Sequence, residues 1–278
     1  MRLIELGPGR GTLMRDALRA ARKVPGFLEA ATVHLVEISS ALREAQREML
    51  ATLPDLPSIT WHEAIDGVPE GPAIIVANEF LDALPIRQLV HVDGAWHERV
   101  VGLDAQDALT FADGEKVAGP ARAPTQPEPG DIIEVREGEE LLLAELAARH
   151  GPLVALFIDY GPAVATVGDT LQAVRRHGYV DPLPAPGTAD LTAHVLFAEL
   201  ARKAQAAGLA ADGPVTQAEF LGRLGIAERA TRLMAANPAK AGQIEAGVQR
   251  LMAPTGMGQL FKVLAVRSRT LPAPVPFG

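Results

Sequence analysis

The pattern that most restricts the fold of this chain lies within its first 22 residues. An apolar strand that ends in Glu5 is followed at once by a glycine-rich turn and then by a helix-compatible segment, 13–22. The glycines stand at alternate positions, at Gly7, Gly9 and Gly11. Glycine lets the backbone turn sharply and approach a ligand closely because it has no Cβ. The start of the following helix offers unpaired N–H groups to an anionic group. Strand, glycine turn and helix in this order predict a cradle for a ligand.

Strand and helix patterns alternate through the first half of the chain. Strand patterns cover residues 2–6, 32–37, 59–62 and 73–77, and helical patterns cover residues 13–22 and 39–50. Strands that are apolar throughout, such as AIIVA at 73–77, are typical of sheets covered on both faces. The alternation therefore predicts an α/β fold, Rossmann-like, with a mostly parallel sheet and helices on both sides.

Residues 86–135 interrupt this alternation. IRQLVHV and AWHERVVGL flank Asp93 and Gly94, a pair typical of a hairpin turn. A segment rich in proline, glycine and acids follows at 112–130. We interpret 86–135 as an antiparallel hairpin and loop that is inserted into one domain spanning 1–278.

The parallel pattern resumes after this insertion. Helices are expected at 141–149, at 192–207 and from 220, and strands at 153–159 and 259–267. Asp190 or Thr192 can cap the second of these helices, and His194 is expected to be a packing or hydrogen-bonding residue. Residues 161–189 are predicted to be a long loop, which in a compact domain is usually functional or disordered.

Composition and charge restrict the class of partner. The formal net charge is −8, so a phosphate backbone is repelled on average and nucleic acid is disfavoured as the main partner. The chain has no cysteine, and its seven histidines show no HExxH spacing, so no metal site is expected. No segment approaches the roughly 20 apolar residues that span a bilayer. Strand residues follow Met1 directly, so we expect no signal peptide and a cytoplasmic protein, one that lacks an N-terminal segment found in its relatives.

The glycine spacing distinguishes between two nucleotide ligands. A dinucleotide-binding turn has the form GxGxxG, whose third glycine would fall at Thr12, whereas this chain has GxGxG. Glu5 can accept hydrogen bonds from a ligand ammonium group, which S-adenosylmethionine has and NAD lacks. Glu37 ends the second strand and can accept hydrogen bonds from ribose hydroxyls, although a solvated strand end is the alternative for Glu37 alone. Asp66 is a candidate for the adenine contact, or part of a plain loop.

Polar side chains follow the fourth and fifth strands, at the edge where such sheets bind ligands. They are Asn78, Glu79, Asp82, Asp159 and Tyr160. Buried acids cost desolvation free energy unless they meet a cation or hydrogen-bond donors. An incoming guanidinium would satisfy two acids in a bidentate manner. In the alternative interpretation, Asn78 caps the following turn and Glu79 pairs with a basic residue such as Arg87.

Several longer strings resemble those of one known family. ELGPGRGTL, VEISSALREAQ, ANEFLDALP, DYG, GDTLQAVRRHGYVDPL, PGTADLTAH and MGQLFKVL are similar to the MidA-like family, which includes a mitochondrial complex I assembly methyltransferase. The resemblance runs from residue 3 almost to residue 266 and is weak only at 90–135. It implies a class I S-adenosylmethionine-dependent methyltransferase that methylates a protein arginine. The mitochondrial relative suggests a respiratory complex I subunit as the type of acceptor.

The resemblance also implies roles for the residues named above. The three glycines would shape the methionine end of the cofactor site, Glu37 would take the ribose, and the polar residues after the fourth and fifth strands would border the acceptor pocket. Two features depart from the family pattern. A segment that resembles a lid over the cofactor is absent before the first strand, which bears on cofactor retention. Leu196 stands where an acid is usual, which bears on the active site.

Methyl transfer by in-line displacement at the sulfonium is the predicted reaction. Glu79 and Asp82 would localise the charge of the guanidinium and leave one nitrogen nucleophilic, while the protein positions the acceptor and excludes water. A binding or assembly module that keeps the cofactor fold is the second hypothesis, motivated by the missing segment and by Leu196. An NAD-dependent oxidoreductase is disfavoured by Thr12 and by the lack of an evident hydride-transfer acid.

Overall fold

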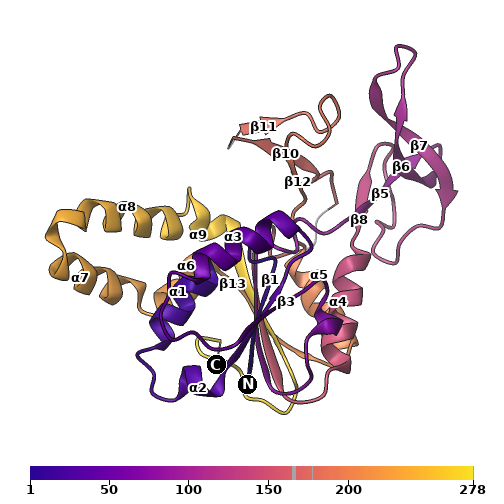
Figure 1. Cartoon of the computed structure of the whole chain (residues 1–278). Coiled ribbons are helices and arrows are strands. Elements are labelled where there is room, and N and C mark those ends of the chain that lie inside the picture. Colours follow the sequence, from indigo (N-terminus) through magenta and orange to yellow (C-terminus); the bar gives the residue numbers. More distant parts are fainter. Residues whose placement is uncertain (165–166, 177, 278) are drawn as a thin grey trace.

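The computed structural model describes residues 1–164, 167–176 and 178–277. At its centre lies a seven-stranded sheet in the order β13-β14-β9-β4-β1-β2-β3, with helices on both faces (Figure 1). β1, β2, β3, β4 and β9 run parallel, and β14 is antiparallel to both of its neighbours. The strands are β1 Arg2–Leu6, β2 Thr32–Val36, β3 Ile59–His62, β4 Ala73–Asn78, β9 Leu153–Tyr160, β13 Ala210–Thr216 and β14 Phe261–Arg267. This arrangement confirms the predicted Rossmann-like fold.

Two apolar layers hold the helices against this sheet. Successive strand residues point to opposite faces, so Leu3 packs in one layer and Ile4 in the other. The layer around Leu3 lies under α1 (Thr12–Ala21) and α3 (Ser40–Leu50), with the short α2 (Phe27–Ala30) beside it. The layer around Ile4 lies under α4 (Glu137–Ala148) and α5 (Phe197–Ala206). Burial on both faces explains why β4 is apolar from Ala73 to Ala77.

Residues 86–135 contain a four-stranded antiparallel sheet in the order β7-β6-β5-β8. Its strands are β5 Arg87–Val92, β6 Ala95–Leu103, β7 Leu109–Val117 and β8 Ile132–Val135. The expected hairpin turn is present, with positive φ at both Asp93 and Gly94. β7 occupies part of the segment that was expected to be a loop. This sheet has its own small core of Leu89, Trp96 and Ile133, and we refer to it as the inserted sheet.

A second small sheet, in the order β11-β10-β12, lies above the central strands (Figure 1). It is formed by β10 Gln172–Arg175, β11 Gly178–Val180 and β12 Asp190–Thr192. Two predictions are therefore wrong. Residues 161–189 are not all loop, and the helix expected from 192 begins at Phe197, because β12 pairs with β10 and leaves neither Asp190 nor Thr192 as a cap. Within the string GDTLQAVRRHGYVDPL, His177 lies outside the described residues.

The remaining helices lie between β13 and β14. They are α6 Gln217–Arg223, α7 Ile226–Ala236, α8 Ala241–Met252 and α9 Met257–Leu260. A short 3-10 turn, η2 Pro238–Lys240, lies between α7 and α8, and another, η1 Ile65–Gly67, lies between β3 and β4. α7 and α8 pack against each other and extend from the body (Figure 1). Within the described part of the chain, no helix has both the length and the apolar character needed to span a membrane.

Candidate functional site

The glycine turn is present, and its backbone is left-handed at each of the three glycines. Gly7, Gly9 and Gly11 have φ values of 61°, 53° and 78°. A Cβ on Gly7 would lie 2.8 Å from Phe80 Cδ2, so the ring of Phe80 packs directly on the turn. A Cβ on Gly9 would meet no atom within 4 Å. The turn is therefore tightly packed on the side of Gly7 and open at Gly9.

Glu5 is a buried acid beneath this turn, with 3% of its surface exposed. Burial raises its pKa from 4.5 to about 7, although a hydrogen bond from the Met14 backbone N–H opposes the shift. Its Oε2 is buried and has no hydrogen-bond partner among the described residues. Because a buried acceptor without a donor is costly, this oxygen fits a ligand that brings a positively charged donor. The ammonium group of S-adenosylmethionine is such a donor.

Gln46 connects the turn to the neighbouring strand ends, although no pattern in the sequence singles it out. Its side chain is fully buried. Nε2 donates to the Gly9 carbonyl at 2.7 Å and to Glu37 Oε2 at 3.4 Å, and Oε1 accepts from Trp61 Nε1 at 2.9 Å. One amide group thus fixes Gly9 and the Glu37 carboxylate next to each other.

The Glu37 carboxylate consequently faces the glycine turn. Its Oε1 accepts from the Ser39 backbone N–H at 2.9 Å, and Oε2 takes the bond from Gln46. Each carboxylate oxygen has a further lone pair, so both can still accept from the two hydroxyls of a ribose. Asp66 lies in η1 and is exposed, and its negative charge raises the pKa of Glu145 on α4, after the larger effect of burial. Its predicted adenine contact stays a prediction.

Asp159 holds the backbone of the loop that follows β4, residues 79–82, which we call the acidic loop. Its Oδ2 accepts the backbone N–H groups of Phe80, Leu81 and Asp82 at 3.2, 3.0 and 3.2 Å, and its Oδ1 accepts that of Tyr160 at 2.9 Å. Burial and the charge of Asp82 raise its pKa, and these N–H donors oppose the shift. Asp159 therefore acts on the loop backbone rather than presenting its carboxylate to a ligand.

The loop held by Asp159 presents two further acids. Glu79 is exposed and has a left-handed φ of 49°, and Asn78 Nδ2 donates to its Oε1 at 3.4 Å. The alternative pairing of Glu79 with Arg87 is wrong, because Arg87 pairs with Glu98 and Glu137 instead. Asp82 is buried, and burial raises its pKa, with a smaller contribution from the charge of Glu79. Its Oδ1 has no hydrogen-bond partner among the residues described.

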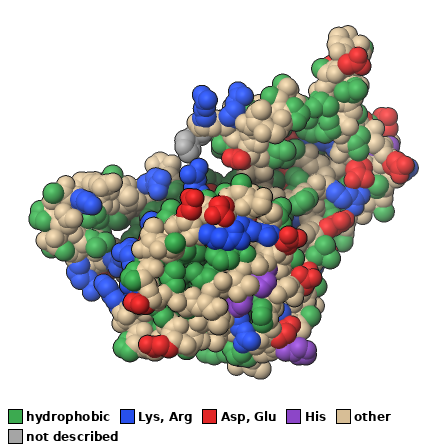
Figure 2. Space-filling model, in the orientation of Figure 1, with side chains coloured by type: hydrophobic (Ala, Val, Ile, Leu, Met, Phe, Trp, Pro, Cys, Tyr) green, Lys and Arg blue, Asp and Glu red, His purple; other side chains and the backbone are tan. Residues whose placement is uncertain are grey.

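A cavity of about 650 Å³ adjoins this loop. Its lining includes Glu79, Asp82, Tyr160 and His194, together with residues of the β10-β11-β12 sheet. The Tyr160 side chain interacts with the Asp82 carboxylate and packs edge-on against the His194 ring, with the ring centroids 5.5 Å apart. Figure 2 shows the hollow between the body of the molecule and the small sheet above it. We call this the acceptor cavity.

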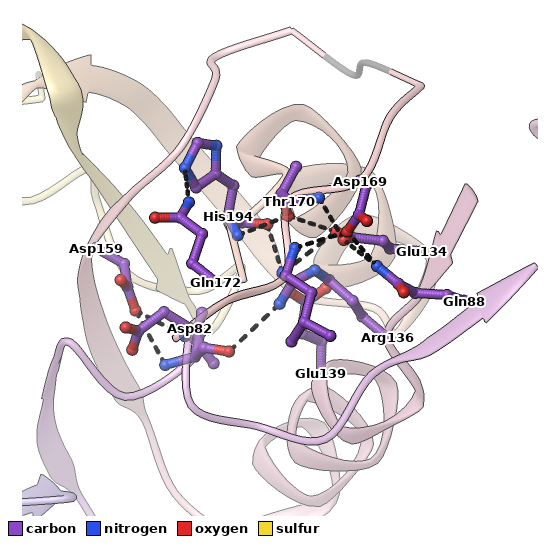
Figure 3. A network of polar contacts seen from close by, with 12 residues as sticks. Asp82, Gln88, Glu134, Arg136, Glu139, Asp159, Asp169, Thr170, Gln172 and His194 are labelled. Carbon is purple, nitrogen blue, oxygen red and sulfur yellow. Dashed lines mark hydrogen bonds and ion pairs between the residues drawn. The ribbon is translucent and has the colours of Figure 1, made fainter. Parts of the chain in front are cut away.

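A buried ionic network supports the walls of the acceptor cavity from behind (Figure 3). Arg136 donates to the carbonyls of Leu81 and His194, which belong to two different walls. It also lies 3.9 Å from Glu134 and 3.6 Å from Glu139. His194 hydrogen-bonds Gln172 at 2.8 Å through Nε2, which confirms its expected hydrogen-bonding role. Arg136 was not among the expected site residues, because a single arginine after a strand carries no signal of burial.

Leu196, the departure from the family pattern, lies outside the acceptor cavity. It is buried immediately before α5 and lines a different cavity, of about 400 Å³, on the far side of Arg136. The described residues contain no group of three or more His, Cys, Asp or Glu side chains suited to holding a metal ion.

Comparisons with known proteins agree with this geometry. A family model described as "Putative S-adenosyl-L-methionine-dependent methyltransferase" matches residues 1–215. The chain is 35% identical to the protein arginine methyltransferase NDUFAF7 homolog of Drosophila melanogaster and 36% identical to NDUFAF7 of Mus musculus. Each match covers 95% of this chain, and 67% and 66% of those proteins, so the chain spans about two thirds of their length.

A solved structure is similar over almost the whole chain. It is a "likely methyl transferase from Burkholderia thailandensis bound to S-adenosyl-homocysteine", with a TM-score of 0.84 and 30% identity. The match covers 98% of this chain and 72% of that one. One expectation is wrong: both NDUFAF7 relatives are named as mitochondrial proteins, which contradicts the expected cytoplasmic location.

Proposed function

The chain belongs to the family of S-adenosylmethionine-dependent methyltransferases that matches residues 1–215, and on this premise we propose that its methyl acceptor is a protein arginine. The observation that carries the proposal is the pair of acids beside the acceptor cavity, the exposed Glu79 and the buried Asp82 with its unpartnered Oδ1. A guanidinium offers five N–H donors in a planar fork and suits two such carboxylates. The relatives named protein arginine methyltransferases support the same acceptor.

The cofactor site would be formed by the glycine turn and the acids around it. The unpartnered Oε2 of Glu5 would accept from the ammonium group, Glu37 would bind the ribose hydroxyls, and the open space at Gly9 would receive the ligand. S-adenosylmethionine supplies an activated methyl group on a sulfonium. Phe80 touches Gly7 and directly follows Glu79, so the turn and the acidic loop are adjacent.

One of the two acids would also accept the proton that the acceptor nitrogen loses. A free guanidinium stays protonated at neutral pH, so one N–H proton would have to leave as the methyl carbon exchanges its bond to sulfur for a bond to that nitrogen, with S-adenosylhomocysteine as the other product. The pKa of Asp82 is raised, mainly by burial. A carboxylate with a raised pKa is a better base, so Asp82 Oδ1 would take the proton. Glu79 would hold the remaining positive charge of the guanidinium.

Glu79→Gln tests this assignment. We expect S-adenosylhomocysteine to bind the variant as tightly as the wild type, whereas transfer of a radiolabelled methyl group to arginine-bearing peptides falls at least tenfold. Asp93→Asn is a matched control, because Asp93 is an acid with the same φ of 49° in the turn of the inserted sheet. Unchanged transfer by Glu79→Gln would remove Glu79 from the mechanism. Transfer to lysine peptides in place of arginine peptides would refute the acceptor class.

The identity of the acceptor protein is a separate proposal. The resemblance suggests a respiratory complex I subunit, and we propose that class of acceptor for this chain. Methylation of purified complex I subunits should proceed faster than that of unrelated proteins with equal arginine content. Equal rates would contradict this choice of acceptor without affecting the arginine assignment.

A further inference from the structure

A second groove leads away from the acceptor cavity, between the inserted sheet and β12. It has a volume of about 400 Å³, and its floor is the segment that follows the acidic loop, Ala83 to Gln88. Two of its lining residues, Asp82 and Thr192, also line the acceptor cavity. The two hollows therefore meet at these side chains. We call the second one the side groove.

The junction of the two hollows contains two buried side-chain oxygens. Asp82 Oδ1 has no hydrogen-bond partner among the described residues, and Thr192 Oγ1 is buried with only its interaction with the Tyr160 hydroxyl. Buried oxygens of this kind are costly unless a donor reaches them. An arginine that enters the acceptor cavity from the side groove would bring N–H donors past both atoms.

The walls of the side groove carry exposed apolar side chains, and the charged side chains among them, Arg87, Glu98 and Arg99, are held in ion pairs. Val101 on β6 and Leu191 on β12 each have 54% of their surface exposed. Phe111 pairs with Val101 across β6 and β7, and the Arg99 guanidinium stacks 3.7 Å above its ring. Arg99 also binds Asp169 at 2.6 Å. Such walls favour apolar side chains of a ligand over charged ones.

The two walls are fixed to each other by buried hydrogen bonds. Glu134 on the inserted sheet accepts from Thr170 N at 2.8 Å and from Thr170 Oγ1 at 2.6 Å (Figure 3). Gln88 bridges Glu134 and Asp169 at 3.1 and 2.8 Å. Because the walls are already held in place, binding of a segment does not incur the entropic cost of ordering them.

We propose that the side groove binds the extended segment of the protein substrate next to the target arginine and selects apolar side chains there. The inference rests on the proposed arginine acceptor, and it adds a specificity for the sequence around that arginine. Val101 and Leu191 would contact the flanking side chains. The side chain of the target arginine would pass Asp82 and Thr192 as it bends from the side groove into the acceptor cavity.

Val101→Asp and Val100→Asp form a matched pair for the test. The two residues are neighbours on β6 and point to opposite faces of the sheet. Val100 is 40% exposed and does not line the side groove. Leu191→Asp changes the opposite wall at an equally exposed position. The probes are two fluorescein-labelled peptides of equal length, each with one arginine, flanked by leucine and valine or by glycine and serine.

Peptide binding to protein saturated with S-adenosylhomocysteine is measured by fluorescence polarisation, and methyl transfer is measured separately. We expect the wild type to bind the apolar peptide at least tenfold more tightly than the glycine–serine peptide. Val101→Asp and Leu191→Asp should remove that preference and raise KM for the apolar peptide with little change in kcat, whereas Val100→Asp should retain the preference.

The two proposals fail in different ways. Equal behaviour of Val101→Asp and Val100→Asp, equal affinity of the wild type for both peptides, or no binding of either peptide would overturn the side-groove proposal. Val101-dependent binding without any methyl transfer would support the groove and refute the arginine acceptor. Methyl transfer that does not depend on Val101 or Leu191 would refute the groove alone.

Discussion

The substitution Gly9→Ala should affect ligand binding and the stability of the fold to different extents. Gly9 has a φ of 53°, and its missing Cβ points into a space with no atom within 4 Å. A non-glycine residue in the left-handed region costs roughly 1–2 kcal/mol. For a chain of this size that loss lowers Tm by about 2–5 °C. The free protein should therefore fold with only this modest penalty.

The effect on cofactor binding should be much larger if the open space belongs to the ligand. A methyl group forced into a filled site costs about 1–3 kcal/mol. Each 1.4 kcal/mol is about a tenfold change in Kd, so Gly9→Ala should weaken S-adenosylhomocysteine binding by roughly 10- to 100-fold. Isothermal titration gives the affinity, and a thermal melt of the free protein gives the stability.

Gly94→Ala is the matched control. Gly94 has a φ of 75° in the turn of the inserted sheet, and its missing Cβ also meets nothing within 4 Å. It should lose the same stability and bind S-adenosylhomocysteine with the wild-type affinity. If Gly9→Ala and Gly94→Ala bind the ligand equally well, the space at Gly9 is not part of the cofactor site and the reasoning fails.

Three further substitutions test the residues around the turn and the acidic loop. Because the folded pKa of Glu5 is raised to about 7, the folded state keeps a proton that the unfolded state loses near pH 4.5, so stability should fall as pH rises between these values. S-adenosylhomocysteine affinity should rise with pH over the same range, and Glu5→Gln should flatten both profiles in melts and titrations. Gln46→Leu leaves the Gly9 carbonyl and the Trp61 N–H without their partner, which should cost about 1–3 kcal/mol per group in urea unfolding and weaken the ligand at least tenfold. Asp159→Asn places an amide N–H2 against backbone donors, so kcat should fall at least tenfold while S-adenosylhomocysteine affinity changes little, and an unchanged kcat would count against its control of the acidic loop.

Much of the central sheet could be predicted because its signals are local. β1, β2 and β4 are mostly apolar, with Glu5 next to the last residue of β1, Glu37 directly after β2 and Asn78 at the end of β4. The Ser39 side chain accepts from the Leu42 backbone N–H, as expected for the cap of α3. Spacing along the chain is sufficient for these features because the residues that interact are close in sequence.

The features that were missed depend on contacts between distant segments. Thr192 was assigned to a helix, but pairing with Gln172 on β10 keeps the chain extended there. Gln46 has the appearance of an exposed helical residue, and its burial follows from Gly9 and Trp61. Arg136 is buried because it binds carbonyls 55 and 58 residues away. α8 was not expected, although Ile244, Val248 and Leu251 recur at helical spacing, and none of its residues is buried in the structure.

A crystal structure of the chain with S-adenosylhomocysteine tests the central claim most directly. The account predicts that the amino group of the ligand lies on Glu5, its ribose hydroxyls on Glu37 and its sulfur toward the loop that carries Glu79. A ligand bound away from the glycine turn, or a ribose that does not reach Glu37, would contradict it.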